Sequence, residues 1–297
     1  MIINRGNIAI LNQAFNTAFK AGFQTVTPMW NRIATEVPST TSEEKYAWLG
    51  KTTKFREWVG DRQYQNLKLH DYTIKNKTYE NTVEVEREDV EDDKYGVYNM
   101  PMQMLGEDAA LHPDELVFSL LGTGFSGKCY DGQPFFDTDH PVVRGSATVS
   151  VSNNGGGAGT AWYLLNVGKL LKPIIYQKRR PYAFIPKTKV DDDNVFDKNK
   201  FVYGADGRSN VGFGLWQTAF ASRQTLDEAG YAAARAAMFG FKFDNGQPVN
   251  QGGKFLLVVP PSLENVALKQ VQAERLANGA DNVFRNTAEV FVCPWLT

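Results

Sequence analysis

The stretch 46–86 constrains this chain most, because its side chains alternate as in a β-strand yet form no continuous hydrophobic run. Its first part, YAWLGKTTKFREWVGDRQYQ, sets tryptophans among cationic side chains. A hairpin of this composition has little to anchor it in a core, so it is either a solvated excursion or a loop that binds a partner. The folded body must therefore come from the rest of the chain.

Residues 7–23 predict an amphipathic helix with Asn7 as its N-cap. Apolar side chains recur there at helical spacing, at Ile8, Leu11, Phe15, Phe19 and Phe23. Pro28 and Pro38 then favour an extended connector. A single helix cannot bury its own apolar face, so this one must dock on the body of the protein or on a neighbouring chain.

A second helical pattern covers 99–121, and His112 followed by Pro113 is expected to break it, with Asp114 capping a second piece.

Strands that pair antiparallel are predicted after this helix, at 161–165, 173–177, 182–190, 200–204 and 211–220. The last part of the chain predicts a helix with a capping box at Thr225 and Glu228, a strand at 255–259, a helix capped by Ser262 and a strand at 289–293. The predicted fold class is α+β.

Charge and composition exclude several classes of protein. Thirty-two cationic side chains against 33 anionic ones give a formal charge of −1, which excludes a nucleic-acid binder driven by net charge. The N-terminal residues do not form a signal peptide, and no apolar run is long enough to span a membrane. We therefore expect a protein that is cytosolic when made, with no membrane partner.

Candidate catalytic or metal-binding chemistry concentrates around His140, because the chain has only three histidines and two cysteines. His140 lies in the run DTDHP, with Asp137 and Asp139 beside it and Cys129 upstream. A turn in which the histidine caps a backbone group is the favoured interpretation. A metal site or a catalytic pair of Cys129 and His140 remains the alternative.

Three other motifs favour plain structural interpretations. Residues 122–128, GTGFSGK, resemble phosphate-binding loops, but a helix precedes them, so we expect a helix terminator. The acidic run 191–193 lacks the ligand order of a calcium loop and predicts a surface turn. A basic cluster is compatible with nucleic-acid contact, strand-end charges or a subunit interface; it comprises Lys169, Lys172, Lys178, Arg179 and Arg180.

A series of segments resembles, in content and order, the Mu-like bacteriophage major head subunits of the gpT family: YAWLGKTTKFREWVGDR, NKTYE, REDVEDDKYGVY, HPDELVFSLL, CYDGQPFFDTDHP, AWYLL, PIIYQKRRP, VGFGLWQTAF and LLVVPPSLE. This resemblance implies the Hong Kong 97-type capsid fold. The implied parts are an N-terminal arm at 1–45, an extended hairpin loop at 46–86, a peripheral domain with spine helix and antiparallel sheet at 87–220, and an axial α/β domain at 221–297.

The resemblance implies a structural major capsid protein of a tailed phage, and not an enzyme. Hexamers and pentamers of the chain would form an icosahedral shell around double-stranded DNA, with scaffold and portal proteins as partners. The chain would reside in the virion, and in the host cytoplasm during assembly. No cofactor and no metal are implied. The rival classes are an enzyme that uses Cys129 and His140, and a tail protein or compartment shell.

Charge suggests where subunits of such a shell would meet. Cations outnumber acids seven to four between residues 47 and 80, whereas 84–93 holds seven acids and one arginine. We expect the extended loop of one subunit to lie on the acidic stretch of another. The candidate contacts are Lys51, Lys54 and Arg56 with Glu91, Asp92 and Asp93. The alternative for the acidic stretch is a solvated face.

Overall fold

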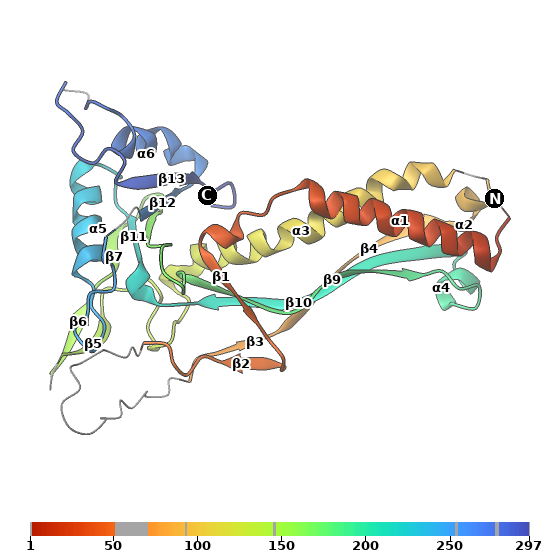
Figure 1. Ribbon diagram of the computed structural model, residues 1–297, viewed down its shortest axis with the longest axis horizontal. Coiled ribbons are helices and arrows are strands. Elements are labelled where there is room, and N and C mark those ends of the chain that lie inside the picture. The colour runs from red at the N-terminus through yellow and green to blue at the C-terminus, as the bar shows by residue number, and fades with distance from the viewer. Residues whose placement is uncertain are drawn as a thin grey trace, which may run out of the picture.

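Two long helices, α1 (Arg5–Thr25) and α3 (Asn99–Gly122), lie side by side along the longest axis of the molecule (Figure 1). The computed structural model describes residues 2–50, 71–92, 94–144, 147–252, 255–276 and 279–296. The predicted N-terminal helix is confirmed, and its apolar face packs on the body of its own chain, with Phe15 fully buried. Its cap is Asn4, whose side chain accepts the backbone N–H of Asn7, so the prediction of Asn7 as cap was wrong.

Glycines let the backbones of these two helices touch. A Cβ atom on Gly22 would lie 2.0 Å from the carbonyl oxygen of Gln103, and one on Gly106 would lie 2.1 Å from that of Phe19. Real side chains do not tolerate such distances, so both positions require glycine at this crossing.

The helix α3 runs unbroken through Pro113, contrary to the predicted break, and His112 lies inside it. Fully buried side chains lie on both sides of the proline, among them Met102 and Phe118, so burial of the whole helix outweighs the loss of one backbone donor. Asp114 does not cap a helix. Its carboxylate is 1% exposed and accepts the backbone N–H groups of Met29 and Trp30, which fixes the chain where it leaves α1.

A four-stranded sheet supports the two helices, in the order β1 (Ala34–Pro38), β9 (Ile174–Lys187), β10 (Lys200–Phe213) and β4 (Lys77–Glu86). β9 pairs antiparallel with β10, and β10 with β4, whereas β1 runs parallel to β9. The antiparallel pairing was predicted for this part of the chain, but its strand bounds were wrong: 173–177 and 182–190 form the single strand β9, and β10 runs on past 200–204 to Phe213. Three short elements lie at the far end of this long half: α2 (Arg87–Glu91), η2 (Tyr95–Tyr98) and α4 (Asp193–Phe196).

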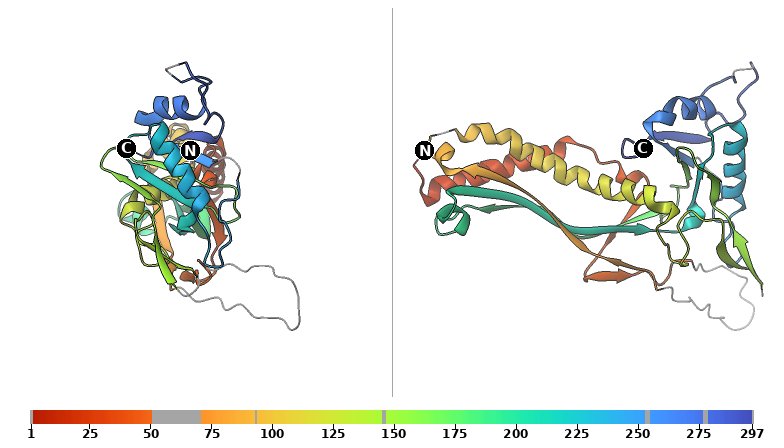
Figure 2. Two further views of the ribbon diagram at one scale, coloured as in Figure 1. Left: turned by 90° about the vertical axis from the view of Figure 1, so that its left-hand side faces the viewer. Right: turned by 180° about the vertical axis from the view of Figure 1, so that it is seen from behind.

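The other end of the molecule is built on a five-stranded sheet (Figure 2). Its order is β13 (Ala288–Val292), β12 (Phe255–Val259), β8 (Trp162–Leu165), β11 (Ala219–Arg223) and β7 (Asn154–Gly157). The helices α5 (Glu228–Gly240) and α6 (Glu264–Val271) pack against it. Asp227 caps α5 in place of the predicted capping box, and Leu263, with no side-chain hydrogen bond, precedes α6 in place of Ser262.

Two small antiparallel sheets complete the fold. In one, β2 (Glu43–Lys45) pairs with β3 (Thr73–Lys75), so the two ends of the stretch around 46–72 leave the body side by side. In the other, β5 (His140–Arg144) pairs with β6 (Ala147–Val151). Single 3-10 turns occur at η1 (Trp30–Arg32), η3 (Thr123–Phe125), η4 (Trp216–Thr218) and η5 (Pro261–Leu263).

The sheets cross the boundaries drawn from the sequence. β4 lies within 46–86 yet pairs with β10, and β8 lies within 87–220 yet pairs with β12 of the C-terminal part. A sequence pattern locates strands but not their partners, which is why these pairings could not be anticipated.

Candidate assembly surface

The acidic stretch begins on β4, where its carboxylates meet a cation of the neighbouring strand. Lys200 on β10 lies 2.7 Å from a carboxylate oxygen of Glu84 and 3.2 Å from one of Glu86. The hydrogen bond and the charge of Lys200 lower the pKa of Glu84. The first acids of the stretch are thus partly compensated within the sheet.

The following acids, on and after α2, lie at the surface. Glu91 pairs with Arg87 at 3.1 Å and Asp92 with Lys94 at 3.3 Å, while the side chains of Glu91 and Asp92 remain 47% and 63% exposed. A second cation could therefore approach both carboxylates. The structure describes only two of the six predicted contact residues, Glu91 and Asp92. The other four lie outside the described residues: Lys51, Lys54, Arg56 and Asp93.

Exposed apolar side chains follow these acids in the sequence, in η2 and the first turns of α3. Val97 in η2 is 75% exposed, and Met100 and Met104, one turn apart on α3, are 64% and 55% exposed. We name these three residues the α3 patch. Apolar side chains with a charged rim are typical of protein interaction sites. The sequence does not reveal the α3 patch, because apolar residues occur on both faces of this helix.

Large apolar side chains are also exposed at two turns. Phe196 in α4 is 84% exposed and Leu170, between β8 and β9, is 96% exposed. The acidic run 191–193 forms the predicted surface turn beside α4, with the Asp192 carboxylate accepting the backbone N–H of Lys189. Together with the α3 patch, these positions spread apolar contact area from the far end of the long half to the segment that joins the two sheets.

Part of the basic cluster is paired within the chain. Lys178 lies 3.3 Å from Glu36, Arg180 lies 2.5 Å from Asp206, and the ammonium group of Lys172 donates to the carbonyl of Asn31. These contacts occupy the three residues within the chain. Lys178 and Arg180 lie inside β9, so they are not the strand-end charges that the sequence offered as one alternative.

The glycine motif 122–128 is the end of a helix, as predicted. The N–H groups of Ser126 and Gly127 both donate to the carbonyl of Thr123, so they are used within the turn and do not converge on a phosphate position.

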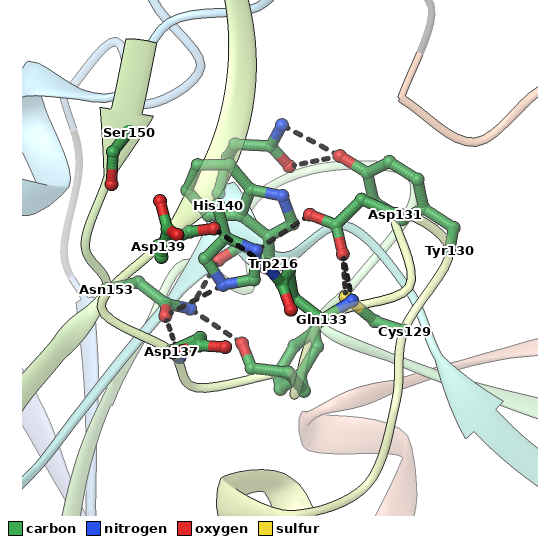
Figure 3. A network of polar contacts seen from close by, with 12 residues as sticks. Cys129, Tyr130, Asp131, Gln133, Asp137, Asp139, His140, Ser150, Asn153 and Trp216 are labelled. Carbon is green, nitrogen blue, oxygen red and sulfur yellow. Dashed lines mark hydrogen bonds and ion pairs between the residues drawn. The ribbon is translucent and has the colours of Figure 1, made fainter.

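The structure does bring Cys129 and His140 into one buried cluster (Figure 3). The link between them is Asp131, which accepts the Cys129 thiol at 3.0 Å and contacts His140 Nδ1 at 2.7 Å. The cluster does not include the acids that the sequence indicated, Asp137 and Asp139. Asp137 Oδ1 instead accepts a hydrogen bond from the backbone N–H of Thr138. His140 is therefore not a turn cap but a side chain of β5 turned into the protein.

The cluster does not have the electrostatics of a cysteine nucleophile. Burial and the neighbouring Asp131 raise the pKa of the Cys129 thiol well above its usual value. A catalytic cysteine needs the opposite shift and a histidine that takes its proton.

Comparison with known proteins shows that the sequence is similar to those of phage head subunits. The family model described as Mu-like prophage major head subunit gpT matches residues 8–296. The major capsid protein of Escherichia phage Mu is 38% identical over 290 residues, 95% of each chain. The Mu-like prophage FluMu major head subunit of Haemophilus influenzae is 42% identical over 282 residues, 91% of each chain.

Solved structures with the same fold are subunits of phage heads. A chain in the procapsid of bacteriophage JBD30 superposes with a TM-score of 0.87 at 42% identity, covering 99% of this chain and 100% of that one. A chain in the JBD30 capsid superposes with a TM-score of 0.77 at 33% identity, covering all of both chains. The likeness therefore extends to the long half, the five-stranded end and the segments that join them.

Proposed function

This chain belongs to the Mu-like prophage major head subunit gpT family, and we propose that its hexamers and pentamers form an icosahedral head that encloses double-stranded DNA. It is a major capsid protein of a tailed phage with the Hong Kong 97-type fold. The observation that carries the proposal is the match to head subunits along nearly the entire chain. The exposed α3 patch supports it, because such side chains need neighbouring subunits to cover them.

The proposal extends to the parts of the subunit. Residues 1–45 serve as arm, 46–86 as extended loop, 87–220 as peripheral domain and 221–297 as axial domain. Pairing of β2 with β3 supports a loop that leaves the body at this point. Strand β4 has a double role under this division, since it follows the loop and also completes the four-stranded sheet.

The proposed partners and location follow from shell assembly. Scaffold and portal proteins would join the chain during assembly in the host cytoplasm, and DNA would be enclosed without sequence-specific contacts. The near-neutral net charge supports enclosure over tight binding of DNA. Among the described residues, no helix has the length and hydropathy to cross a membrane. The raised pKa of the Cys129 thiol supports a role without catalysis.

Light scattering of the purified chain tests the proposed assembly. Over a range of concentration and salt, we expect rings or closed shells, because the α3 patch is otherwise left in water. A strictly monomeric species under every condition, with and without scaffold, would contradict the proposal.

We further propose that Lys51, Lys54 and Arg56 of one subunit dock on Glu91, Asp92 and Asp93 of another. Because Glu91 and Asp92 already have cationic neighbours, the added attraction should steer docking and fix its register more than it adds affinity. Its range is about 8 Å at physiological salt.

Charge reversal tests this docking. Changing Lys51, Lys54 and Arg56 to glutamate should slow or block assembly while circular dichroism stays unchanged, and lysines at Glu91, Asp92 and Asp93 should restore it. A control triple reversal alters net charge equally on exposed lysines elsewhere, at Lys20, Lys187 and Lys242. Assembly of the first variant at the wild-type rate in low salt would leave the acidic stretch as a solvated face.

A further inference from the structure

The polar cluster beneath the loop 129–133 has no role in the proposed shell contacts. Cys129 and His140 are 4% and 0% exposed, and the Asp131 side chain is 7% exposed. The thiol sulfur, a carboxylate oxygen and a histidine nitrogen all lie within 4.8 Å of one another. Figure 3 shows Asp131 linked to both Cys129 and His140, with the His140 ring against that of Trp216. In the described part of the chain, no other group of three such side chains meets this criterion.

Hydrogen bonds fix which atoms of the histidine are available. Asn153 donates through its amide nitrogen to the carbonyls of Phe135 and Ala219, so its Oδ1 faces His140 Nε2 at 3.1 Å. His140 Nε2 must therefore carry a proton. The other nitrogen, Nδ1, points at Asp131 Oδ2, and the ring stacks on Trp216 with 4.0 Å between centroids.

The buried charge of the cluster is balanced. Both ring nitrogens face acceptors, and the hydrogen bond between Nδ1 and Asp131 Oδ2 holds one proton, which leaves that pair neutral as a whole. Burial alone would raise the pKa of Asp131, but hydrogen bonds from His140 and Cys129 lower it. With a neutral thiol, the three side chains sum to zero charge, as a buried site requires.

We propose that this cluster is a binding site for a divalent transition metal of the zinc type, with Cys129 Sγ, an Asp131 oxygen and His140 Nδ1 as its ligands. Binding expels two protons, one from the thiol and one from the hydrogen bond between Nδ1 and Oδ2, and adds two positive charges, so the net charge stays zero. Thiolate and imidazole select zinc-like ions over magnesium or calcium.

The surroundings already resemble the outer shell of such a site. The remaining N–H of His140 keeps its acceptor, Asn153 Oδ1, which orients the ring as metal-bound histidines require. The backbone N–H of Gln133 donates to Asp131 at 3.1 Å and holds the carboxylate in place. Tetrahedral zinc with these ligands needs separations of about 3.5 Å between ligand atoms. The observed contacts of 3.0 Å and 2.7 Å therefore have to open slightly when two protons are replaced by a metal.

A bound metal would join the loop after α3 to the first residue of β5. Asn153 connects the same cluster to the main chain of Ala219 in β11, an inner strand of the five-stranded sheet. The expected effect is stabilisation of the end built on the five-stranded sheet, independent of contacts between subunits.

Cobalt provides the direct probe. Metal-free purified chain titrated with Co²⁺ should develop near-ultraviolet thiolate-to-cobalt absorption that saturates at one ion per chain and is removed by Zn²⁺. Zinc at a hundredfold excess over its Kd should raise the melting temperature by about 5 °C. Cys129→Ser should abolish the absorption, whereas Cys293→Ser, at the other buried cysteine, should retain it.

Two results would overturn the site. One is a folded wild-type chain that shows neither the absorption nor the shift in melting temperature with either ion. The other is an absorption of equal strength in Cys129→Ser. If that variant fails to fold, the wild-type titration and its competition with Zn²⁺ still decide, and shell assembly by the same wild-type sample shows whether the capsid role stands separately.

Discussion

Asp114 shows how one buried carboxylate can hold two segments together. Its carboxylate accepts hydrogen bonds from the backbone N–H groups of Met29 and Trp30, which burial removes from water. Asp114→Ala therefore leaves both donors without an acceptor. We expect a loss of about 2–3 kcal/mol in the free energy of unfolding, measured by urea denaturation of the unassembled subunit. Asp114→Asn should cost less than half as much, because its amide oxygen can accept both N–H groups. Burial raises the pKa of Asp114, so at pH 7 the neutral amide avoids an electrostatic cost that the carboxylate carries.

Glu44 gives a local dependence on pH. Its carboxylate accepts the N–H groups of Thr40 and Thr41 and the hydroxyl of Ser39, and these bonds lower its pKa to about 2. A lowered pKa means that the stabilisation is complete above the ordinary value of 4.5 and is lost as the pH falls towards 2. Hydrogen exchange at the Thr40 and Thr41 amides, corrected for intrinsic rates, should lose protection over that interval. In Glu44→Gln the same dependence should vanish; its persistence would assign it to another group.

At the scale of elements, the contact between α1 and α3 depends on glycine. Gly106→Ala would normally stabilise a helix, but here the new methyl group meets the backbone of Phe19. We expect a loss of ~1–3 kcal/mol, measured by chemical denaturation. Gly96→Ala is the matched control, since a Cβ atom there has no neighbour within 4 Å. Equal stability of the two variants would mean that the helices do not cross as described.

The sequence predicts elements better than it predicts their ends and partners. The helix over 7–23 and the strand over 255–259 follow from local periodicity, and both are confirmed. The break at Pro113 was wrong, because a helix buried on both sides of a proline gains more from packing than it loses in one hydrogen bond. The caps failed for a similar reason: several Asn, Asp, Ser and Thr side chains lie near each helix start, and tertiary packing decides which one is used.

The candidate sites were predictable to different degrees. The sequence indicates Cys129 and His140 as a possible pair, but it favours Asp137 and Asp139, next to the histidine, over Asp131, which makes the contacts. The signal for Asp131 is its position two residues after Cys129. The acidic stretch was evident from composition, whereas its pairing with Lys200 depends on the register of β4 against β10.

At the scale of the whole molecule, the subunit buries the apolar face of α1 internally and leaves other apolar side chains exposed. Because α1 docks on α3 of the same chain, it needs no neighbouring subunit to fold, so the unassembled subunit should be stable. The exposed α3 patch then becomes the place where assembly can be weakened without unfolding. Met100→Lys with Met104→Lys should impair shell formation in light scattering while the melting temperature of the free subunit stays within about 2 °C. Unimpaired assembly would exclude the α3 patch from the subunit contacts.

Cryo-electron microscopy of the assembled chain tests the central claim most directly. We predict closed shells with both fivefold and sixfold capsomers, in which α1 remains packed on α3 of the same subunit and the α3 patch is covered by a neighbouring copy. Particles without such capsomers, or dispersed subunits under all conditions that include scaffold, would contradict the claim that this chain builds a phage head.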